Sequence, residues 1–201
     1  YLDRMNLNPC PSFEHQSVDM MFAEMEAADT QIGVIGVPGP TSDRGLAPTS
    51  ADTIADIVVA HPDRFVGFGS VESSDVESAV ARLGELAAVG MRGVTIDPST
   101  AQLSRRFDDR ALYPLFDEAE RLGLVVTTTM SSLLGPYMDD CRPEYADRVA
   151  TDFPNLTVII QHGGWPYALE AIGAAYKQPN LYVVPSQYIH YWWACRGYAN
   201  E

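Results

Sequence analysis

The 201-residue sequence is poor in basic residues and has no long apolar run. Lysine and arginine total 13 against 27 aspartates and glutamates, which gives a formal net charge of −14 at pH 7. A nucleic-acid partner is excluded, because binding phosphates requires a basic face and the 13 cations form no run. Purely apolar stretches reach only five residues, whereas spanning a bilayer takes roughly 20, so a membrane partner is excluded as well.

Cysteine is also scarce. Cys10, Cys141 and Cys195 are an odd number and form no CxxC motif, which favours reduced thiols over a disulfide framework and predicts a cytoplasmic, soluble protein. No signal-peptide pattern is present, and the first residue is Tyr1 and not Met. Either a start has been removed or the chain belongs to a longer one.

Short apolar or β-branched segments recur along the chain. They cover residues 32–37, 65–71, 93–97, 124–129, 157–162 and 181–184, and successive segments begin 24 to 33 residues apart. Because they are almost continuously apolar and do not alternate, they are typical of strands buried on both faces.

The segments between these strands have the periodicity of amphipathic helices. We expect helices over residues 18–28, 50–60, 75–89, 109–122, 143–152 and 166–176. Strands that alternate with helices predict a parallel sheet with right-handed crossovers. Two folds satisfy this pattern, an open doubly wound sheet and a closed (β/α)₈ barrel.

Two observations favour the barrel. The sequence has neither a GxGxxG motif after the first strand nor a Walker loop, the usual phosphate-binding signatures of doubly wound folds. Polar residues follow four different strands, at Asp97, Thr129, His162 and Ser186 or Gln187. In a barrel these strand ends meet at one mouth, where active sites lie. We therefore predict an α/β fold of the (β/α)₈ TIM-barrel type, with residues 1–201 in a single domain.

His162 is the main candidate for chemistry. It ends a strand and is followed by two glycines, and an imidazole there can act as a general base or as a metal ligand. The structural alternative is a buried histidine that is hydrogen-bonded to a carbonyl. Asp97 could bind a metal or a substrate hydroxyl, or cap the turn that begins at Pro98. Thr129 offers a hydroxyl at its strand end, although β-branched residues also simply favour strands.

An aromatic cluster lies late in the chain, and it could wall an apolar ligand or form a subunit interface. Its members are Trp165, Tyr188, Tyr191, Trp192 and Trp193, with His190 among them.

Arg105, Arg106 and Arg142 could hold an acidic substrate or be ordinary surface residues. No metal site can be assembled from the sequence, since the four histidines show no HxH or HExxH spacing. We expect His61 to be structural, because it ends a helix just before a strand.

Five segments resemble the amidohydrolase-related branch of the amidohydrolase superfamily. They are residues 61–71, 90–98, 108–116, 153–164 and 179–183, and the resemblance covers roughly residues 17 to 188 in order. That branch includes aminocarboxymuconate-semialdehyde decarboxylase, the resorcylate-type decarboxylases, and hydrolases or lactonases of aromatic-degradation acids.

The resemblance implies roles for particular positions. His162 corresponds to the sixth-strand histidine, which acts on substrate or a bound water. Thr129 stands where the family usually places a metal-binding histidine, and the first-strand HxH and the eighth-strand aspartate have no counterpart. A zinc or manganese ion is thus implied by the family, but no ligand is assignable in this chain.

The six predicted strands correspond to the second to the seventh of the family barrel. A βα unit takes about 30 residues, so we expect about 30 residues before Tyr1 and a longer piece after Glu201.

These observations predict an amidohydrolase-related enzyme that hydrolyses or non-oxidatively decarboxylates a small aromatic or carboxylated molecule. His162 is its expected acid/base residue, and Asp97, Thr129, Trp165 and Ser186 are expected to line the pocket. The alternative is a catalytically inactive or metal-free relative that binds a small molecule or a partner. A homo-oligomer is expected, since an exposed sheet edge or the Trp192–Trp193 patch would otherwise face water.

Overall fold

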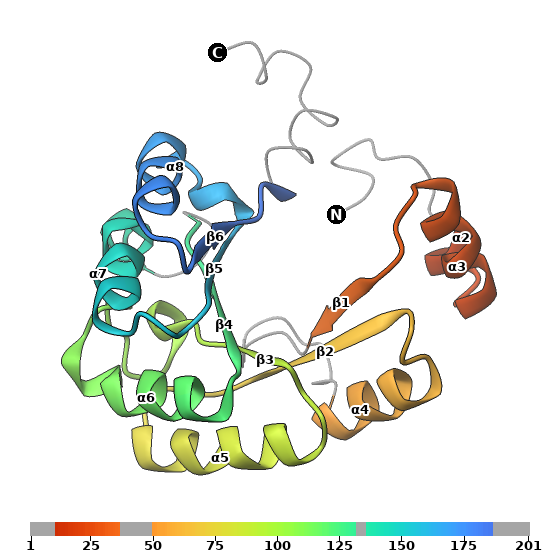
Figure 1. The fold of residues 1–201 in the computed structure, drawn as a ribbon, viewed down its shortest axis with the longest axis horizontal. Coiled ribbons are helices and arrows are strands. Elements are labelled where there is room, and N and C mark those ends of the chain that lie inside the picture. The colour runs from red at the N-terminus through yellow and green to blue at the C-terminus, as the bar shows by residue number, and fades with distance from the viewer. Residues whose placement is uncertain (1–10, 37–49, 132–135, 187–201) are drawn as a thin grey trace.

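The computed structural model describes residues 11–36, 50–131 and 136–186, and it contains one sheet of parallel strands (Figure 1). The strands are β1 (Gly33–Gly36), β2 (Phe65–Ser70), β3 (Gly93–Thr95), β4 (Val125–Thr129), β5 (Val158–Gln161) and β6 (Leu181–Val183). Their order in the sheet is their order in the sequence, β1-β2-β3-β4-β5-β6. All six strands predicted from the apolar segments are confirmed.

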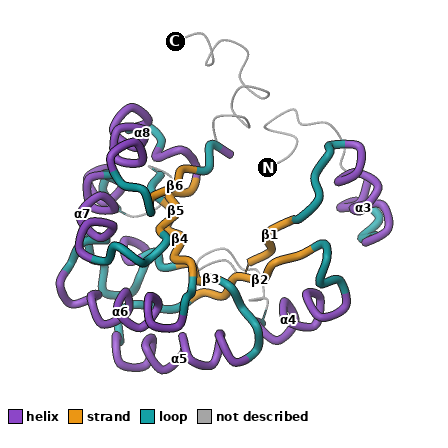
Figure 2. The backbone as a smooth tube through the Cα atoms, viewed as in Figure 1, coloured by secondary structure: helices purple, strands orange, loops and turns teal. Residues whose placement is uncertain are grey.

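The sheet curves into an arc, and the helices that connect its strands lie on the convex side (Figures 1 and 2). The described α-helices are α2 (Pro11–Glu14), α3 (Val18–Ala27), α4 (Ala51–Ala60), α5 (Val76–Ala88), α6 (Tyr113–Leu122), α7 (Glu144–Asp152) and α8 (Ala168–Lys177). A doubly wound sheet would carry helices on both faces. Helices on one side of a curved parallel sheet confirm the barrel type, and these strands form part of its wall.

The helix boundaries follow from local capping. The side chains of Ser17, Ser50 and Asp75 accept hydrogen bonds from backbone amides three residues on, as N-cap residues do. The α-helix α6 begins later than the predicted residue 109, because Arg110–Leu112 first form a 3₁₀ turn, η2. The four-residue α2 was not predicted, since so short a segment shows no periodicity.

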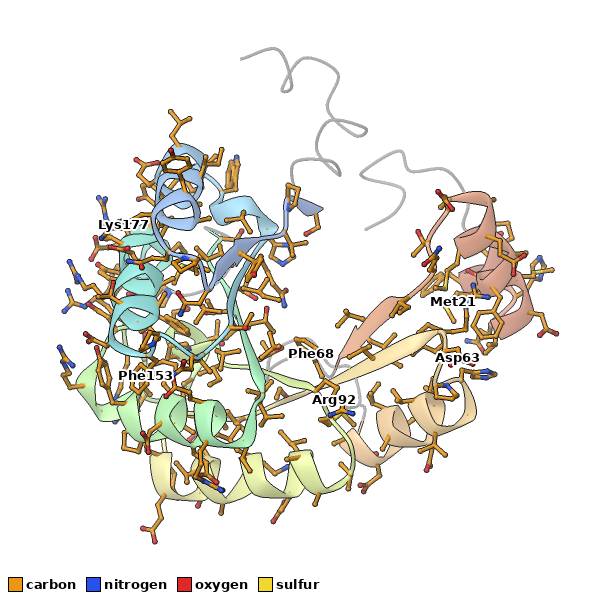
Figure 3. All side chains as sticks on the ribbon, viewed as in Figure 1. Met21, Asp63, Phe68, Arg92, Phe153 and Lys177 are labelled. Atoms are coloured by element: carbon orange, nitrogen blue, oxygen red, sulfur yellow. The ribbon has the colours of Figure 1, made fainter. Side chains whose placement is uncertain are left out.

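The core lies between the strands and the helices, and side chains fill this layer (Figure 3). Its strand residues include Val94, Val126, Val158 and Ile160, all fully buried, and Ile96 directly after β3 is fully buried too. Because side chains alternate across a strand, the residues between these positions face the concave side. That alternation turns Asp97, Thr127, Thr129 and Gln161 toward the inside of the arc.

Close packing of the helix layer requires glycine in β2. A Cβ on Gly69 would lie 2.4 Å from Cδ2 of Leu86, a fully buried residue of α5. A glycine here therefore lets α5 approach the sheet. None of the helices in the described part of the chain combines the length and apolar character that crossing a membrane requires.

Candidate functional site

Four of the sequence-predicted site residues form two hydrogen-bonded pairs at the carboxyl ends of the strands. Asp97 follows β3 and bonds Thr129 at the end of β4. His162 follows β5 and bonds Ser186, which follows β6. Parallel strands bring their carboxyl ends to the same edge, so both pairs lie at the edge where barrel enzymes place their active sites.

The first pair joins two neighbouring strands through both carboxyl oxygens of Asp97. The Thr129 backbone N–H donates to Oδ1 at 2.6 Å, and the Thr129 hydroxyl donates to Oδ2 at 3.1 Å. Burial raises the pKa of Asp97 above its ordinary 3.8, while two hydrogen bonds from Thr129 and one from the Thr128 side chain act to lower it. Asp97 therefore caps no turn with its side chain in the described structure, and the next turn, η1 (Pro98–Thr100), lacks a side-chain cap.

The second pair is held by an unusual backbone. His162 has φ +60°, in the left-handed region, and Gly163 and Gly164 follow at φ 66° and 68°. For a residue other than glycine this conformation is strained, and such residues cluster at functional sites. These three residues form a short turn, η4 (His162–Gly164), between β5 and α8. A Cβ on Gly164 would lie 2.7 Å from Cβ of Ala171, so the turn packs directly on α8.

The imidazole of His162 is half-buried, and its Nδ1 lies 3.1 Å from Oγ of Ser186. Burial lowers the pKa of His162 from its ordinary 6.5, because a low-dielectric surrounding disfavours the charged ring. The neutral imidazole therefore predominates at pH 7, and any proton that the ring gains is readily given up.

Gln161 is a site residue that sequence reasoning missed. It pairs in register with Thr129, and its Nε2 donates to Oγ1 of Thr127 at 2.7 Å. Thr127 and Gln161 thus share the concave face with Thr129. The signal was the two-residue alternation, which turns Thr127, Thr129 and Gln161 to the face opposite buried Val126 and Ile160.

Trp165 lies immediately after η4, where its backbone N–H donates to the His162 carbonyl at 3.2 Å, and its side chain is half-buried. It is the only described aromatic of the late cluster. Gln187, Tyr188, His190, Tyr191, Trp192, Trp193, Cys10 and Cys195 lie outside the described residues.

The three candidate arginines contact groups outside the two strand-end pairs. Arg105 donates to the Ser73 carbonyl at 3.2 Å, and Arg106 and Arg142 pair with nearby aspartates. Half-exposed ion pairs of this kind are typical of a protein surface. His61 is structural, as predicted, since its ring packs against Phe22 with 5.0 Å between centroids.

Cys141 is a buried thiol that donates to the Ser131 carbonyl. Burial raises the pKa of Cys141 to about 11, so it stays protonated and unreactive at neutral pH. A cavity of about 370 Å³ lies away from the strand-end pairs, between α3, α4, β1 and β2. Its lining is almost entirely apolar, so it lacks the convergent polar groups of a catalytic pocket.

The described residues do not fit a divalent metal centre of their own. Across residues 11–36, 50–131 and 136–186, no three His, Cys, Asp or Glu side chains lie close enough to share an ion. Thr129, at the strand end where the family resemblance implies a histidine ligand, directs its hydroxyl hydrogen to Asp97.

A parallel sheet wrapped by helices, with polar pairs at its strand ends, defines a barrel protein with a site at the barrel mouth. The family model described as amidohydrolase matches residues 7–200, and the chain belongs to this family. The resemblance seen in the sequence is thereby confirmed.

Similar proteins narrow the branch. A curated relative, 2-amino-3-carboxymuconate-6-semialdehyde decarboxylase of Dictyostelium discoideum, is 27% identical over an alignment of 212 positions, which covers 87% of this chain and 58% of the relative. An uncharacterised TIM-barrel protein from Bordetella bronchiseptica is 35% identical with a TM-score of 0.82, over 94% of this chain and 66% of its own. The chain thus spans less than two thirds of either protein.

A third match concerns the fold alone. The structure of 2,6-dihydroxybenzoate decarboxylase from Rhizobium has a TM-score of 0.64 at 15% identity, over 87% of this chain and 72% of that one. It supports the barrel architecture.

Proposed function

We propose that the protein is an enzyme that removes CO₂ from a small aromatic or unsaturated carboxylic acid without an oxidant, with His162 as the proton donor. The observation that carries the proposal is the His162–Ser186 pair, set in a strained turn at the strand ends. The named relative from Dictyostelium is a decarboxylase, which favours this reaction over hydrolysis.

In the proposed reaction, one proton replaces the departing CO₂ on the substrate carbon. The bond between the substrate carbon and its carboxylate breaks, CO₂ leaves, and the electron pair stays on the carbon. The His162 imidazolium gives that carbon a proton and becomes neutral, the form that its lowered pKa favours. Ser186 holds Nδ1, so that Nε2 faces the substrate, and solvent then restores the proton.

The same site could hydrolyse an ester or lactone, with neutral His162 taking a proton from water. The pH profile separates the two reactions. Because decarboxylation uses the protonated ring, kcat/KM would fall as pH rises through the pKa of His162. Because hydrolysis uses the neutral ring, kcat/KM would rise over the same range.

The test is a panel of hydroxybenzoates, unsaturated dicarboxylates, esters and lactones, with CO₂ release and acid production both recorded. We expect His162→Gln to lower kcat/KM by about 100-fold or more, the usual loss for a general acid or base. His15→Gln, at an exposed histidine between α2 and α3, is the matched control. Binding without turnover in the unaltered protein would instead support the inactive binding module.

The metal, the location and the assembly stay proposals. A zinc or manganese ion, if the whole protein binds one, needs ligands beyond the described residues. Cytoplasmic location and a homo-oligomer rest on the composition and on the sheet edges, since β1 and β6 each pair on one side only in the described sheet.

A further inference from the structure

Building on the proposed function, we propose that the Asp97–Thr129 pair selects the substrate by accepting a hydrogen bond from its hydroxyl group. The same pair excludes a second carboxylate from that position. Asp97 is thereby a specificity-determining residue and His162 the catalytic one.

The Asp97–Thr129 pair offers a ligand only hydrogen-bond acceptors. A carboxylate has only acceptors, and the hydroxyl and backbone hydrogens of Thr129 both point to Asp97. The remaining capacity of the pair consists of lone pairs on Oδ1, Oδ2 and Oγ1. A ligand group that meets this corner must therefore donate, which a hydroxyl does and an ionised carboxylate does not.

The Asp97 carboxyl group has no cationic partner among the described residues. None of the ion pairs among the described residues includes Asp97, so its carboxyl group is stabilised by hydrogen bonds from Thr129 and Thr128 and not by a cation. In a partly buried site, a second anion close to such a carboxylate is strongly disfavoured. The net charge of −14 adds to that repulsion.

The spacing of the strands places Asp97 and His162 about one ligand length apart. Asp97 and His162 follow β3 and β5, and a distance of about 10 Å separates strands that are two apart in a sheet. A single aromatic ring with a carboxylate at one end and a hydroxyl at the other bridges such a gap through hydrogen bonds. The carboxylate then meets His162 and Ser186, and the hydroxyl meets Asp97.

The test measures Kd by calorimetry for benzoate, 3-hydroxybenzoate and isophthalate, which differ only in the group at one ring position. We expect the unaltered full chain to bind 3-hydroxybenzoate about 10- to 100-fold more tightly than isophthalate, the range for one hydrogen bond to a charged group. Asp97→Asn removes the charge and adds an amide donor, so this ratio should collapse or invert. Asp75→Asn, at the exposed N-cap of α5, is the matched control.

Thr129→Val separates the role of the Asp97 carboxyl group from that of the Thr129 hydroxyl. It removes the hydroxyl but keeps the backbone N–H bond to Asp97, so the preference for 3-hydroxybenzoate should persist. If the Asp97 variant fails to fold, loss of the preference for 3-hydroxybenzoate in folded Thr129→Val would contradict the proposal.

Equal binding of 3-hydroxybenzoate and isophthalate to the unaltered chain would overturn the inference while leaving the proposed decarboxylase intact. An unchanged ratio in a folded Asp97→Asn variant would overturn it too. Failure of all three acids to bind would refute the proposed aromatic-acid substrate class, and this inference with it.

Discussion

His162 combines a strained backbone with a ring whose charge is disfavoured, and the two features have one cause. The turn η4 has to bring the chain from β5 directly onto α8, where Gly164 touches Ala171. In this turn His162 has φ +60°, and its imidazole is half-buried beside Ser186. Strain that persists in a folded protein is compensated by the surrounding packing, here by the turn against α8.

Burial of His162 predicts a pH-dependent stability. Its folded-state pKa lies below the ordinary 6.5, so the unfolded chain binds a proton first as the pH falls. The free energy of unfolding therefore holds its full His162 contribution above about pH 6.5 and loses it at lower pH. His162→Gln should flatten the decline in unfolding free energy between pH 7 and 5, measured by urea denaturation. His15→Gln should keep the original slope, and parallel slopes for all three proteins would contradict the prediction.

At the scale of elements, Asn180 joins three segments at the end of the α7–β5 unit. Its Nδ2 donates to the carbonyls of Ala150, Phe153 and Leu156 at 3.0, 3.0 and 2.9 Å. These carbonyls lie in the last turns of α7 and in the loop to β5, and Asn180 itself precedes β6. The side chain therefore satisfies helix-end carbonyls that have no partner within the helix.

Asn180→Ala should destabilise the fold by about 2 to 3 kcal/mol, because buried carbonyls lose their donor. For a protein of this size that corresponds to a fall in Tm of roughly 5 to 10 °C. Circular dichroism during heating measures it. Asn155→Ala, at an exposed asparagine in the same loop, should shift Tm by much less. Similar losses in the two variants would show that the bonds of Asn180 add nothing.

The elements themselves were largely predictable, because short apolar or β-branched segments alternate with amphipathic segments along the chain. The expected burial on both faces was wrong for the outer strands, since Val34 of β1 and Tyr182 of β6 are 64% and 54% exposed. Boundaries failed where local geometry overrides periodicity, as at Arg110–Leu112, whose 3₁₀ turn has the same residue types as a helix start. Strand-end residues could be proposed as a group because parallel strands share one carboxyl edge. Which of these residues bond each other could not be predicted, since Asp97 and Thr129 are 32 positions apart and meet only through the sheet register.

Whole-molecule shape and charge act together on substrate entry. The described strands and helices form an arc (Figure 2), and the strand-end pairs lie at the carboxyl edge of its sheet. The protein around that arc has 27 acidic residues against 13 basic ones. A substrate of the proposed carboxylated class would therefore approach against a repulsive field, and only short-range hydrogen bonds at the strand ends would offset it.

This repulsion predicts an unusual salt effect on an enzyme with an anionic substrate. Raising NaCl from roughly 10 to 200 mM shortens the Debye length from about 30 Å to below 10 Å, so most long-range repulsion is screened. KM for the carboxylate should fall by about two- to fivefold, while kcat stays nearly constant because short-range contacts are little screened. Steady-state kinetics across the salt range measure both constants, and a neutral methyl ester used as a competitive inhibitor serves as the control, since its affinity should not change. A KM that rises with salt would mean that local attraction at the strand ends outweighs the net charge of −14.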